Sequence, residues 1–246
     1  MAPSGALGPP VLRPLAERLA SVLDPGPGPV IDAPAAGAEL AAALAGHGRG
    51  GRLALAVGDA GLPARGGVHS VRAQAAHPPV RAACTDLVAS LLTVHAEPDP
   101  AATLRALATL LLPDGRIAVA GWAPGGAPHL IALGAALRAA RGAALPAIAR
   151  EVAFDPAAAL QKAGLELLSD VEIADVVRFQ GAAHLWGAHD GVAGADGLDA
   201  ATVAAVLDDL GTRLLPVTVW DGTLVVPVRL RVVSARVPPP PGRGRG

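Results

Sequence analysis

The chain has 246 residues, 52% of them hydrophobic, which is enough to bury a sizeable core in a single α/β domain. Its formal net charge is −1 and its charged residues are interspersed, so we expect no basic face that neutralises phosphates and no nucleic-acid partner. The single cysteine, Cys84, excludes an internal disulfide and favours a reducing, cytoplasmic location, where we interpret it as a small buried apolar residue.

Neither export nor membrane insertion is expected from the apolar segments. Arg13, Glu17 and Arg18 interrupt the first helical pattern, which does not fit a secretory signal. The longest apolar candidate, 130–149, contains Arg138 and Arg141, so we interpret it as a helical region of a water-soluble domain.

Hydrophobic periodicity predicts a leading helix at 11–23. After a Pro/Gly cluster at 25–29, the pattern predicts these elements in order: a strand at 30–33, a helix at 39–45, and strands at 52–58, 68–73 and 86–93. Only about nine residues separate the strand at 52–58 from the strand at 68–73, whereas a crossover between parallel strands usually takes a dozen or more. We therefore expect the helix of that crossover to be missing or reduced to a turn.

The second half is more regular. A helix begins at Asp99, and Pro113-Asp114-Gly115 predicts a turn before the next strand. The elements predicted from there on are a strand at 116–121, helices within 127–150 broken at Pro146, a helix at 155–163 ended by Gly164, a strand at 166–177, a helix at 199–214 and a strand at 224–237.

Strands that alternate with helices predict an α/β fold, with a mostly parallel sheet, helices on both faces and an antiparallel edge pair formed by the last two strands. We expect one domain at 11–237, in which about 180–215 forms a cap or insert. A flexible N-terminus at 1–10 and a disordered Pro/Gly/Arg tail at 238–246 flank it.

One segment, Val30 to Leu40 (V-I-D-A-P-A-A-G-A-E-L), predicts a strand, a tight turn and a helix start. In an open α/β sheet this first turn is where a nucleotide-type cofactor binds, and it needs glycine for its tightness and for the close approach of the backbone to the ligand. Here proline and alanine occupy most of the turn. The segment therefore favours a cofactor-binding fold but not the usual way of using it.

The order of elements resembles the class I S-adenosylmethionine-dependent methyltransferases, particularly the branch related to ubiquinone and menaquinone biosynthesis enzymes. Four passages carry the resemblance, which covers roughly 11–237: the Val30–Leu40 turn (family V-L-D-x-G-x-G-x-G), 71–80 (G-D-A-x-x-L-P-F), 86–100 (F-D-x-V-x-S, then H-x-x-D-P) and 110–117 (V-L-R-P-G-G-x-L). The resemblance implies a Rossmann-like methyltransferase fold.

The resemblance also implies cofactor contacts. Asp32 would end the first strand, either touching the cofactor or capping the turn, and Gly37 is the glycine that remains in the turn, displaced by one position. Asp59 would hold the ribose hydroxyls, and Gln74 stands where an acidic residue is expected near the adenine amino group. Pro34, Ala36 and Ala38 replace the three glycines of the family turn, so the cofactor motif is degenerate.

Several other side chains invite functional interpretations. His95 falls after the fourth strand, at the ligand side of the sheet, and is our candidate for a catalytic base, with a structural role as the alternative. Trp122 and Trp186 could line a pocket or serve in packing. His184, His189 and Asp190 have a spacing that invites a zinc site, but without a second cysteine we predict no metal site.

These observations leave three hypotheses for the function. The leading one is a catalytically silent methyltransferase-fold protein that serves as a partner or regulatory subunit of an active methyltransferase-like protein, or self-associates, and binds no cofactor. The alternative is an active enzyme that uses S-adenosylmethionine (SAM) to methylate a small apolar or phenolic metabolite. The third is a pocket reused for ligand sensing or another reaction.

Overall fold

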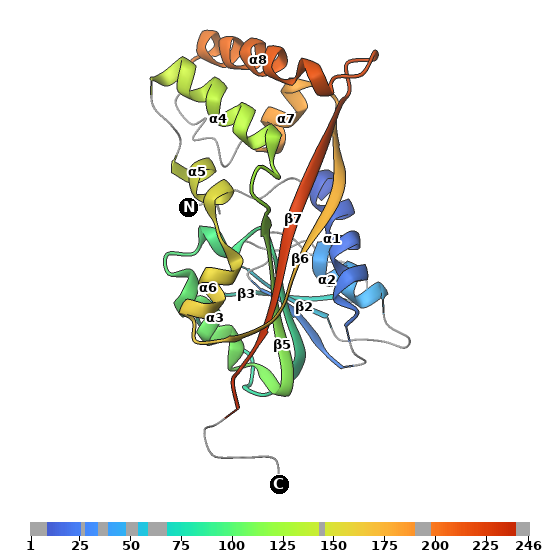
Figure 1. Ribbon diagram of the computed structural model, residues 1–246, viewed down its shortest axis with the longest axis vertical. Helices are drawn as coiled ribbons and strands as arrows, with labels where there is room; N and C mark the ends of the chain where they lie inside the picture. Colours follow the sequence, from blue (N-terminus) through green and yellow to red (C-terminus); the bar gives the residue numbers. More distant parts are fainter. Residues whose placement is uncertain are drawn as a thin grey trace.

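A computed structural model describes residues 9–25, 28–33, 39–47, 54–58, 68–142, 146–189 and 198–239. Its strands form one seven-stranded sheet in the order β3-β2-β1-β4-β5-β7-β6 (Figure 1). The strands are β1 (Val30–Asp32), β2 (Ala54–Gly58), β3 (Val68–Arg72), β4 (Thr85–Leu91), β5 (Leu111–Trp122), β6 (Glu166–Phe179) and β7 (Leu224–Arg236).

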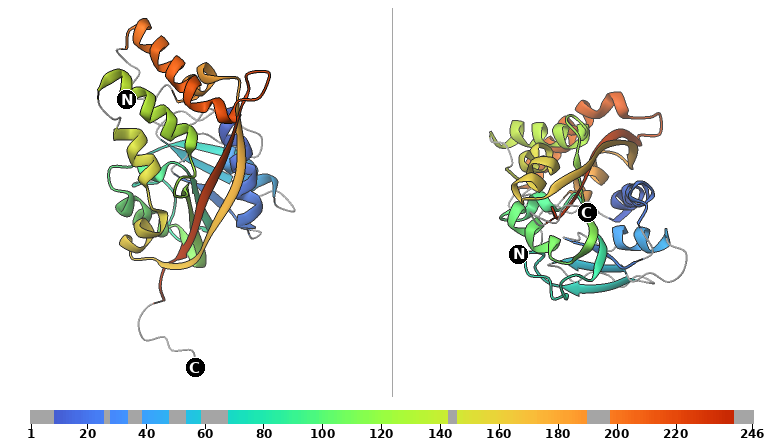
Figure 2. Two further views of the ribbon diagram at one scale, coloured as in Figure 1. Left: turned by 45° about the horizontal axis from the view of Figure 1, so that its top comes forward. Right: turned by 60° about the horizontal axis from the view of Figure 1, so that its bottom comes forward.

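The helices lie on both faces of this sheet and at one end of it (Figure 2). They are α1 (Pro9–Leu23), α2 (Glu39–Gly46), α3 (Pro100–Ala108), α4 (Pro128–Arg141), α5 (Pro146–Ala153), α6 (Pro156–Lys162), α7 (Ala182–Ala188) and α8 (Ala200–Leu214), with short 3-10 turns η1 (Val94–Ala96) and η2 (Leu215–Val217). Helices α1 and α2 cover one face, and α3 and α6 cover the other. Helices α4, α7 and α8 contact one another beyond the end of the parallel strands and form a helical cap.

Alternating side chains of the central strands divide the core into two layers. Val30 and Leu87 join the cluster under α1 and α2, whereas their neighbours Ile31 and Val88 join the cluster under α3 and α6. This alternation follows from the pleat of a strand, which sends successive side chains to opposite faces. Because both faces are covered, the central strands are apolar almost throughout.

The last two strands form a long antiparallel ribbon, which confirms the predicted edge pair. Strand β6 pairs with β7 from Glu166 opposite Arg236 to Phe179 opposite Leu224, and β7 also pairs with the second half of β5. Cross-strand ion pairs line the exposed face of the ribbon, including Arg231 with Asp170 at 2.7 Å. Such pairs stabilise the register of a solvent-facing ribbon modestly.

Most predicted elements are confirmed within a few residues, including the break at Pro146, where α5 begins. One boundary is wrong: β5 begins at Leu111, before the predicted Pro113-Asp114-Gly115 turn. Thr85 pairs with Leu111, but Leu87 pairs with Arg116, so the turn residues form a bulge inside the strand. The expected missing helix at 59–67, residues 1–8 and residues 240–246 lie outside the described residues.

A glycine after β5 determines how the chain enters the cap. Gly126 donates its N–H to Ala123 O at 2.7 Å and accepts from Arg229 N of β7 at 2.9 Å. A Cβ at this position would overlap the carbonyl oxygen of Arg229 and approach that of Ala123 to 2.8 Å. The loop can therefore lie against β7 and lead into α4 only if residue 126 has no side chain.

Substituting this glycine should destabilise the protein. We expect Gly126→Ala to lower the free energy of unfolding by about 2 kcal/mol or more, because a backbone clash forces β7 or the loop to move. Gly46→Ala is the matched control: a Cβ there meets nothing within 4 Å, so it should be neutral or stabilising by up to about 1 kcal/mol. Urea denaturation of both variants provides the measurement, and equal midpoints would contradict the prediction.

Candidate functional site

The carboxyl ends of the parallel strands meet at one edge of the sheet, where open α/β proteins bind ligands. Asp32 is the last residue of β1, Gln74 follows β3, His95 follows β4 and Trp122 is the last residue of β5. The fold therefore brings three of the predicted site residues, Asp32, Gln74 and His95, to the same edge. Gly37 and Asp59 lie outside the described residues.

The Asp32 side chain hydrogen-bonds to the first turn of α2. Its side chain is 3% exposed, and its Oδ2 accepts a hydrogen bond from Ala41 N, in the first turn of α2, at 3.3 Å. Burial raises the pKa of this carboxyl well above its usual range, the Ala41 hydrogen bond opposes that rise, and the nearby Glu39 adds to it. Of the two roles expected for Asp32, the described contact is the capping one.

Gln74 is exposed just past the end of β3, and its main-chain oxygen accepts from His77 N in a turn. Its amide is therefore free of the core and open to solvent. A glutamine amide in this position can accept a hydrogen bond from an exocyclic amine, which is the role that the resemblance gives it.

The turn after β4 has an unusual backbone. Leu92 is 5% exposed and adopts φ +54, in the left-handed region that leucine rarely occupies. Its N–H donates to Ala120 O of β5 at 3.0 Å, which holds the turn in place. Strained residues of this kind gather at functional sites. Here the strained turn leads directly into η1, which carries His95.

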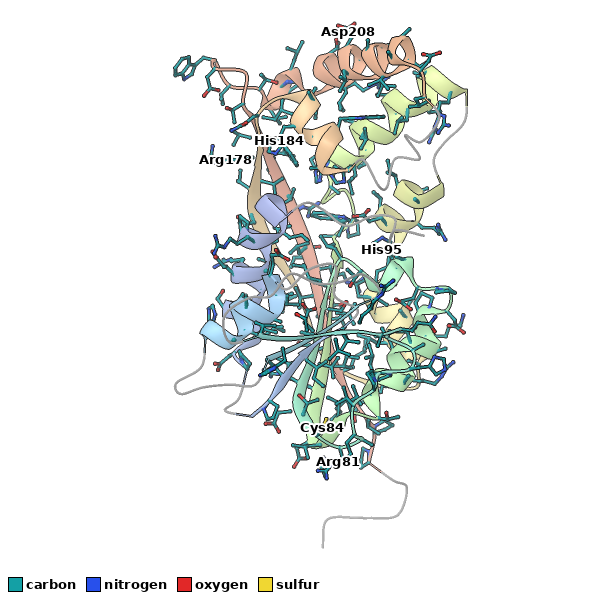
Figure 3. The ribbon with its side chains drawn as sticks, turned by 180° about the vertical axis from the view of Figure 1, so that it is seen from behind. Arg81, Cys84, His95, Arg178, His184 and Asp208 are labelled. Carbon is teal, nitrogen blue, oxygen red and sulfur yellow. The ribbon has the colours of Figure 1, made fainter. Side chains whose placement is uncertain are left out.

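His95, which is labelled in Figure 3, lies against the buried carboxyl group of Glu151. The His95 side chain is 9% exposed and that of Glu151, from α5, is 1% exposed, with Nε2 and Oε2 separated by 3.9 Å. The other carboxylate oxygen, Oε1, accepts a hydrogen bond from Trp122 Nε1 at 3.0 Å. Trp122 thus fixes the orientation of Glu151 and directs Oε2 toward the imidazole. These three residues form what we call the His95 triad.

Burial moves the pKa values of the triad toward neutral side chains. Desolvation lowers the pKa of His95 to about 4, and the charge of Arg150 contributes. Desolvation also raises the pKa of Glu151 to about 7, although the hydrogen bond from Trp122 opposes this. Near neutral pH the imidazole is therefore uncharged and the carboxyl is close to half ionised. The Glu151 carboxyl can therefore accept or release a proton near neutral pH with little change in free energy, and the uncharged imidazole beside it keeps a lone pair to accept one.

Two further imidazoles extend the triad into the helical cap. The edge of Trp122 faces His129 of α4, with ring centroids 5.4 Å apart, and His129 lies 5.6 Å from His189 at the end of α7. Both histidines have 0% exposure, and neither ring nitrogen of either residue has a hydrogen-bond partner among the described residues. Desolvation lowers their pKa values to about 3 and about 4, with His189 contributing to the shift at His129. Four polar nitrogens thus lie beside Phe179 in an otherwise apolar layer.

Sequence reasoning found His95 but missed Glu151 and His129. A glutamate within the apolar pattern of 146–153 was the one available signal for Glu151, because its partners are distant along the chain. Trp122, proposed to line a pocket, is 2% exposed and holds Glu151 instead. Trp186 is half-buried against the apolar core beneath α7.

His184, His189 and Asp190, whose spacing alone invited a zinc site, are only partly described. His184 Nδ1 accepts a hydrogen bond from Gln180 N at 3.0 Å, which ties it to the start of α7. Asp190 lies outside the described residues, and across the parts of the chain that are described no three His, Cys, Asp or Glu residues gather as a metal site would require.

The comparisons with known proteins agree with the fold. A family profile described as a methyltransferase domain matches residues 23–119. Three solved structures align over most of both chains. One is a candidate methyltransferase from Bacillus halodurans, with 14% identity, TM-score 0.56 and coverage of 91% of this chain and 99% of that chain.

The second is a candidate methyltransferase from an antibiotic biosynthesis pathway of Anabaena variabilis, with 14% identity, TM-score 0.57 and coverage of 89% and 96%. The third is a candidate type II methyltransferase from Anaeromyxobacter dehalogenans, with 15% identity, TM-score 0.54 and coverage of 97% and 99%. No curated protein sequence matches the chain. At these identities the likeness shows the fold, which is the Rossmann-like fold of class I methyltransferases, as expected.

Among the described helices, none is long and apolar enough to cross a bilayer.

The buried groups make stability depend on pH in two opposing ways. The folded protein keeps the Glu151 proton up to about pH 7, whereas the unfolded chain releases it near 4.5, so the Glu151 contribution to the free energy of unfolding falls by roughly 3 kcal/mol as pH rises through this range. The three histidines act oppositely, because the unfolded chain binds protons at them below about 6.5 and the folded protein binds them only at about pH 4 or below. Three imidazoles outweigh one carboxyl, so we expect stability to rise as pH rises from about 5 to about 7.

Glu151→Gln should make this rise larger, by about 2 kcal/mol between about pH 5 and about pH 7, because the variant lacks the opposing carboxyl. Urea denaturation between about pH 5 and about pH 8 tests this, with the exposed Glu17→Gln as the control. A Glu151→Gln variant whose stability rises no more than that of the wild type would show that Glu151 does not titrate in this range.

Proposed function

We propose that the protein is a SAM-dependent methyltransferase that acts on a small, largely apolar acceptor carrying a hydroxyl or a similar weakly acidic group. The methyltransferase fold and the family match over 23–119 support the reaction class. The observation that carries the proposal is the His95 triad, because a structural histidine does not need a buried carboxyl with a pKa near 7 oriented by a tryptophan.

The described part of the cofactor region is compatible with SAM. When bound, SAM would supply an electrophilic methyl group. The exposed Gln74 amide would accept from the adenine amine, and Asp32 would act indirectly, by holding the start of α2 at the carboxyl end of β1. Gly37 and Asp59 stay predictions for this cofactor, as does the relation to the ubiquinone and menaquinone branch.

The triad supplies the proton transfer that methylation of a hydroxyl requires. His95 is neutral near pH 7, so the imidazole can accept the proton that the acceptor loses. Because Nε2 faces Glu151, the opposite nitrogen, Nδ1, is the one available to the acceptor. As the imidazole gains positive charge, the Glu151 carboxylate stabilises it, and the Trp122 N–H keeps that carboxylate in position.

The surroundings of His95 favour the acceptor class. Phe154 lies 6.2 Å from His95 by ring centroids, so an acceptor that reaches the imidazole meets an aromatic side chain. Trp122 and Phe179 are buried behind the triad and make its surroundings apolar. A small aromatic alcohol matches an imidazole beside an aromatic ring, because its ring can pack on Phe154 while its hydroxyl meets the imidazole.

A second candidate is the catalytically silent member of the fold. The replacement of the family glycines by Pro34, Ala36 and Ala38 favours it, together with the use of the Asp32 carboxyl to cap α2. Losing even two hydrogen bonds to a charged ligand would weaken binding by roughly 10² to 10⁴. In that case the protein would act as a regulatory partner of an active methyltransferase-like protein.

Titration calorimetry with SAM separates the two candidates. The proposed enzyme should bind SAM with a micromolar Kd, and His95→Ala and His69→Ala should bind it equally well, because neither residue holds the cofactor. With a panel of small phenols and alcohols, formation of S-adenosylhomocysteine should fall by roughly 10² to 10⁴ in His95→Ala and stay unchanged in His69→Ala, whose histidine is exposed on β3.

Failure to bind SAM at millimolar concentration would refute the enzyme and favour the silent partner. Tight binding with equal turnover in both variants would keep the methyltransferase and remove His95 from its mechanism.

A further inference from the structure

Two histidines lie against each other inside the helical cap without polar partners. His129 lies in the first turn of α4 and His189 directly follows α7, with ring centroids 5.6 Å apart. Both residues are 0% exposed, and among the described residues no group forms a hydrogen bond with any of their four ring nitrogens. We call them the histidine pair. A buried polar atom without a partner destabilises the state that buries it, so the pair needs an explanation that packing alone does not give.

The groups packed around the histidine pair are aromatic or aliphatic. Trp122 of β5 lies 5.4 Å from His129 by ring centroids, and Phe179 of β6 lies 5.7 Å from His129 and 6.5 Å from His189. Helices α4, α7 and α8 contact one another, and the buried residues of α7 and α8 are Leu185, Val206, Leu210 and Leu214. An uncharged imidazole is tolerated in such a layer, whereas an imidazolium would lose its hydration without gaining a counter-charge.

The titratable and charged groups of the neighbouring elements are engaged elsewhere. The Glu151 carboxyl of α5 accepts from Trp122 Nε1 and lies 3.9 Å from His95. His184 of α7 lies against Phe179, and its Nδ1 accepts a hydrogen bond from the main chain at the start of that helix. The surface of the packed elements carries Arg138 of α4, Arg178 of β6, Arg229 of β7, and Asp208, Asp209 and Arg213 of α8. Across the described parts of the chain, no carboxylate forms an ion pair with the histidine pair.

Acid should therefore act against the closed cap. An imidazole in water binds a proton near pH 6.5. Burial lowers the pKa of His129 to about 3 and that of His189 to about 4, and the charge of His189 contributes to the shift at His129. Below about pH 6.5, a conformation that lets water reach both rings binds more protons than the closed cap does, so falling pH favours that conformation.

The two helices that carry the histidine pair join the sheet through glycines. Gly125, shortly before α4, adopts φ +66, and Gly181, directly before α7, adopts φ +94. Glycine moves between backbone conformations at little cost, so both connections can absorb a change in the direction of the chain. Helix α5, which follows α4, is held separately by its contacts with η1 and β5 (Figure 1). Helices α4 and α7 can therefore separate while α5 stays on the sheet.

We propose that the histidine pair is an acid-sensitive contact of the cap: uncharged near neutral pH it packs α4 against α7, and its protonation in mild acid separates the two helices. Separation removes His129 from Trp122 and admits water to the layer behind the His95 triad. A helix that has lost its packing is only marginally stable in water, so α4 and α7 should then exchange their amide protons. This device does not depend on the proposed methyltransferase activity.

Hydrogen–deuterium exchange of the full chain, resolved by mass spectrometry at about pH 5 and about pH 7, tests the proposal. Protection factors correct for the pH dependence of the intrinsic exchange rate. The protection of α4 and α7 should fall by roughly 10² to 10³ from the higher to the lower pH, because each histidine favours opening about 20-fold. At about pH 5 it should lie about tenfold or more below the protection of α3, which exchanges only when the whole domain unfolds.

Leucine variants show whether the two rings cause the change, since leucine is close to histidine in size and binds no proton. His129→Leu and His189→Leu should each reduce the pH effect on α4 and α7 to about 20-fold, and the double variant should reduce it to less than about tenfold. His69→Leu, at an exposed histidine of β3, is the matched control and should behave as the wild type. If the double variant fails to fold, the two single variants decide the question.

Three outcomes would overturn the proposal. In the first, α4 and α7 of the wild type keep their protection at about pH 5. In the second, α3 loses protection to the same level as α4 and α7, which means that the domain unfolds as one unit. In the third, the leucine variants lose as much protection as the wild type, so that the pH dependence comes from other groups.

Discussion

The two-sided antiparallel pairing of β7 is the constraint on which the rest of the structure depends. On one side β7 pairs with the full length of β6, and on the other side it pairs with the second half of β5 and so joins the ribbon to the rest of the sheet. The backbone of Arg229 in β7 also hydrogen-bonds to the loop that contains Gly126, and this loop leads the chain into α4 and the helical cap. The position of His129 relative to Trp122 therefore depends on a strand that is distant from both along the chain.

The methyltransferase fold also explains why the residues of the His95 triad meet. Parallel pairing aligns the ends of β1, β4 and β5, and the turn with the strained Leu92 leads from β4 into η1. Helix α5 then supplies a carboxyl from the other side. The low dielectric of this layer is what moves the Glu151 pKa upward and the imidazole pKa values downward, so the electrostatic character of the site follows from packing more than from ion pairing.

The fold could be predicted largely from the sequence, because its signals are local. The Asp99 and Asp155 caps, the break at Pro146 and the apolar strands are each specified by residues close together along the chain. The site was only partly predictable. Glu151 contacts residues 29 and 56 positions away along the chain, and no local pattern distinguishes such a glutamate from a surface one.

Similarly, the pairing of His129 with His189 could not be predicted, because the two residues come together only through the packing of α4 and α7 in the cap. The β5 boundary was misplaced for a related reason: the Pro-Asp-Gly signal for a turn is genuine, but pairing with β4 resumes beyond it, and the strand absorbs the turn as a bulge. Long-range pairing decided the outcome where local propensity was ambiguous.

The three tryptophans stand in three distinct surroundings, and this has an optical consequence. Trp122 is buried against a carboxyl group and an imidazole, Trp186 is half-buried within the cap, and Trp220 is almost fully exposed to water. Indole emission responds to both polarity and neighbouring charge. With no tyrosine and two phenylalanines in the chain, nearly all near-ultraviolet absorption belongs to these indoles. The protein thus carries its own fluorescent reporters, one at the His95 triad and one at its outer surface.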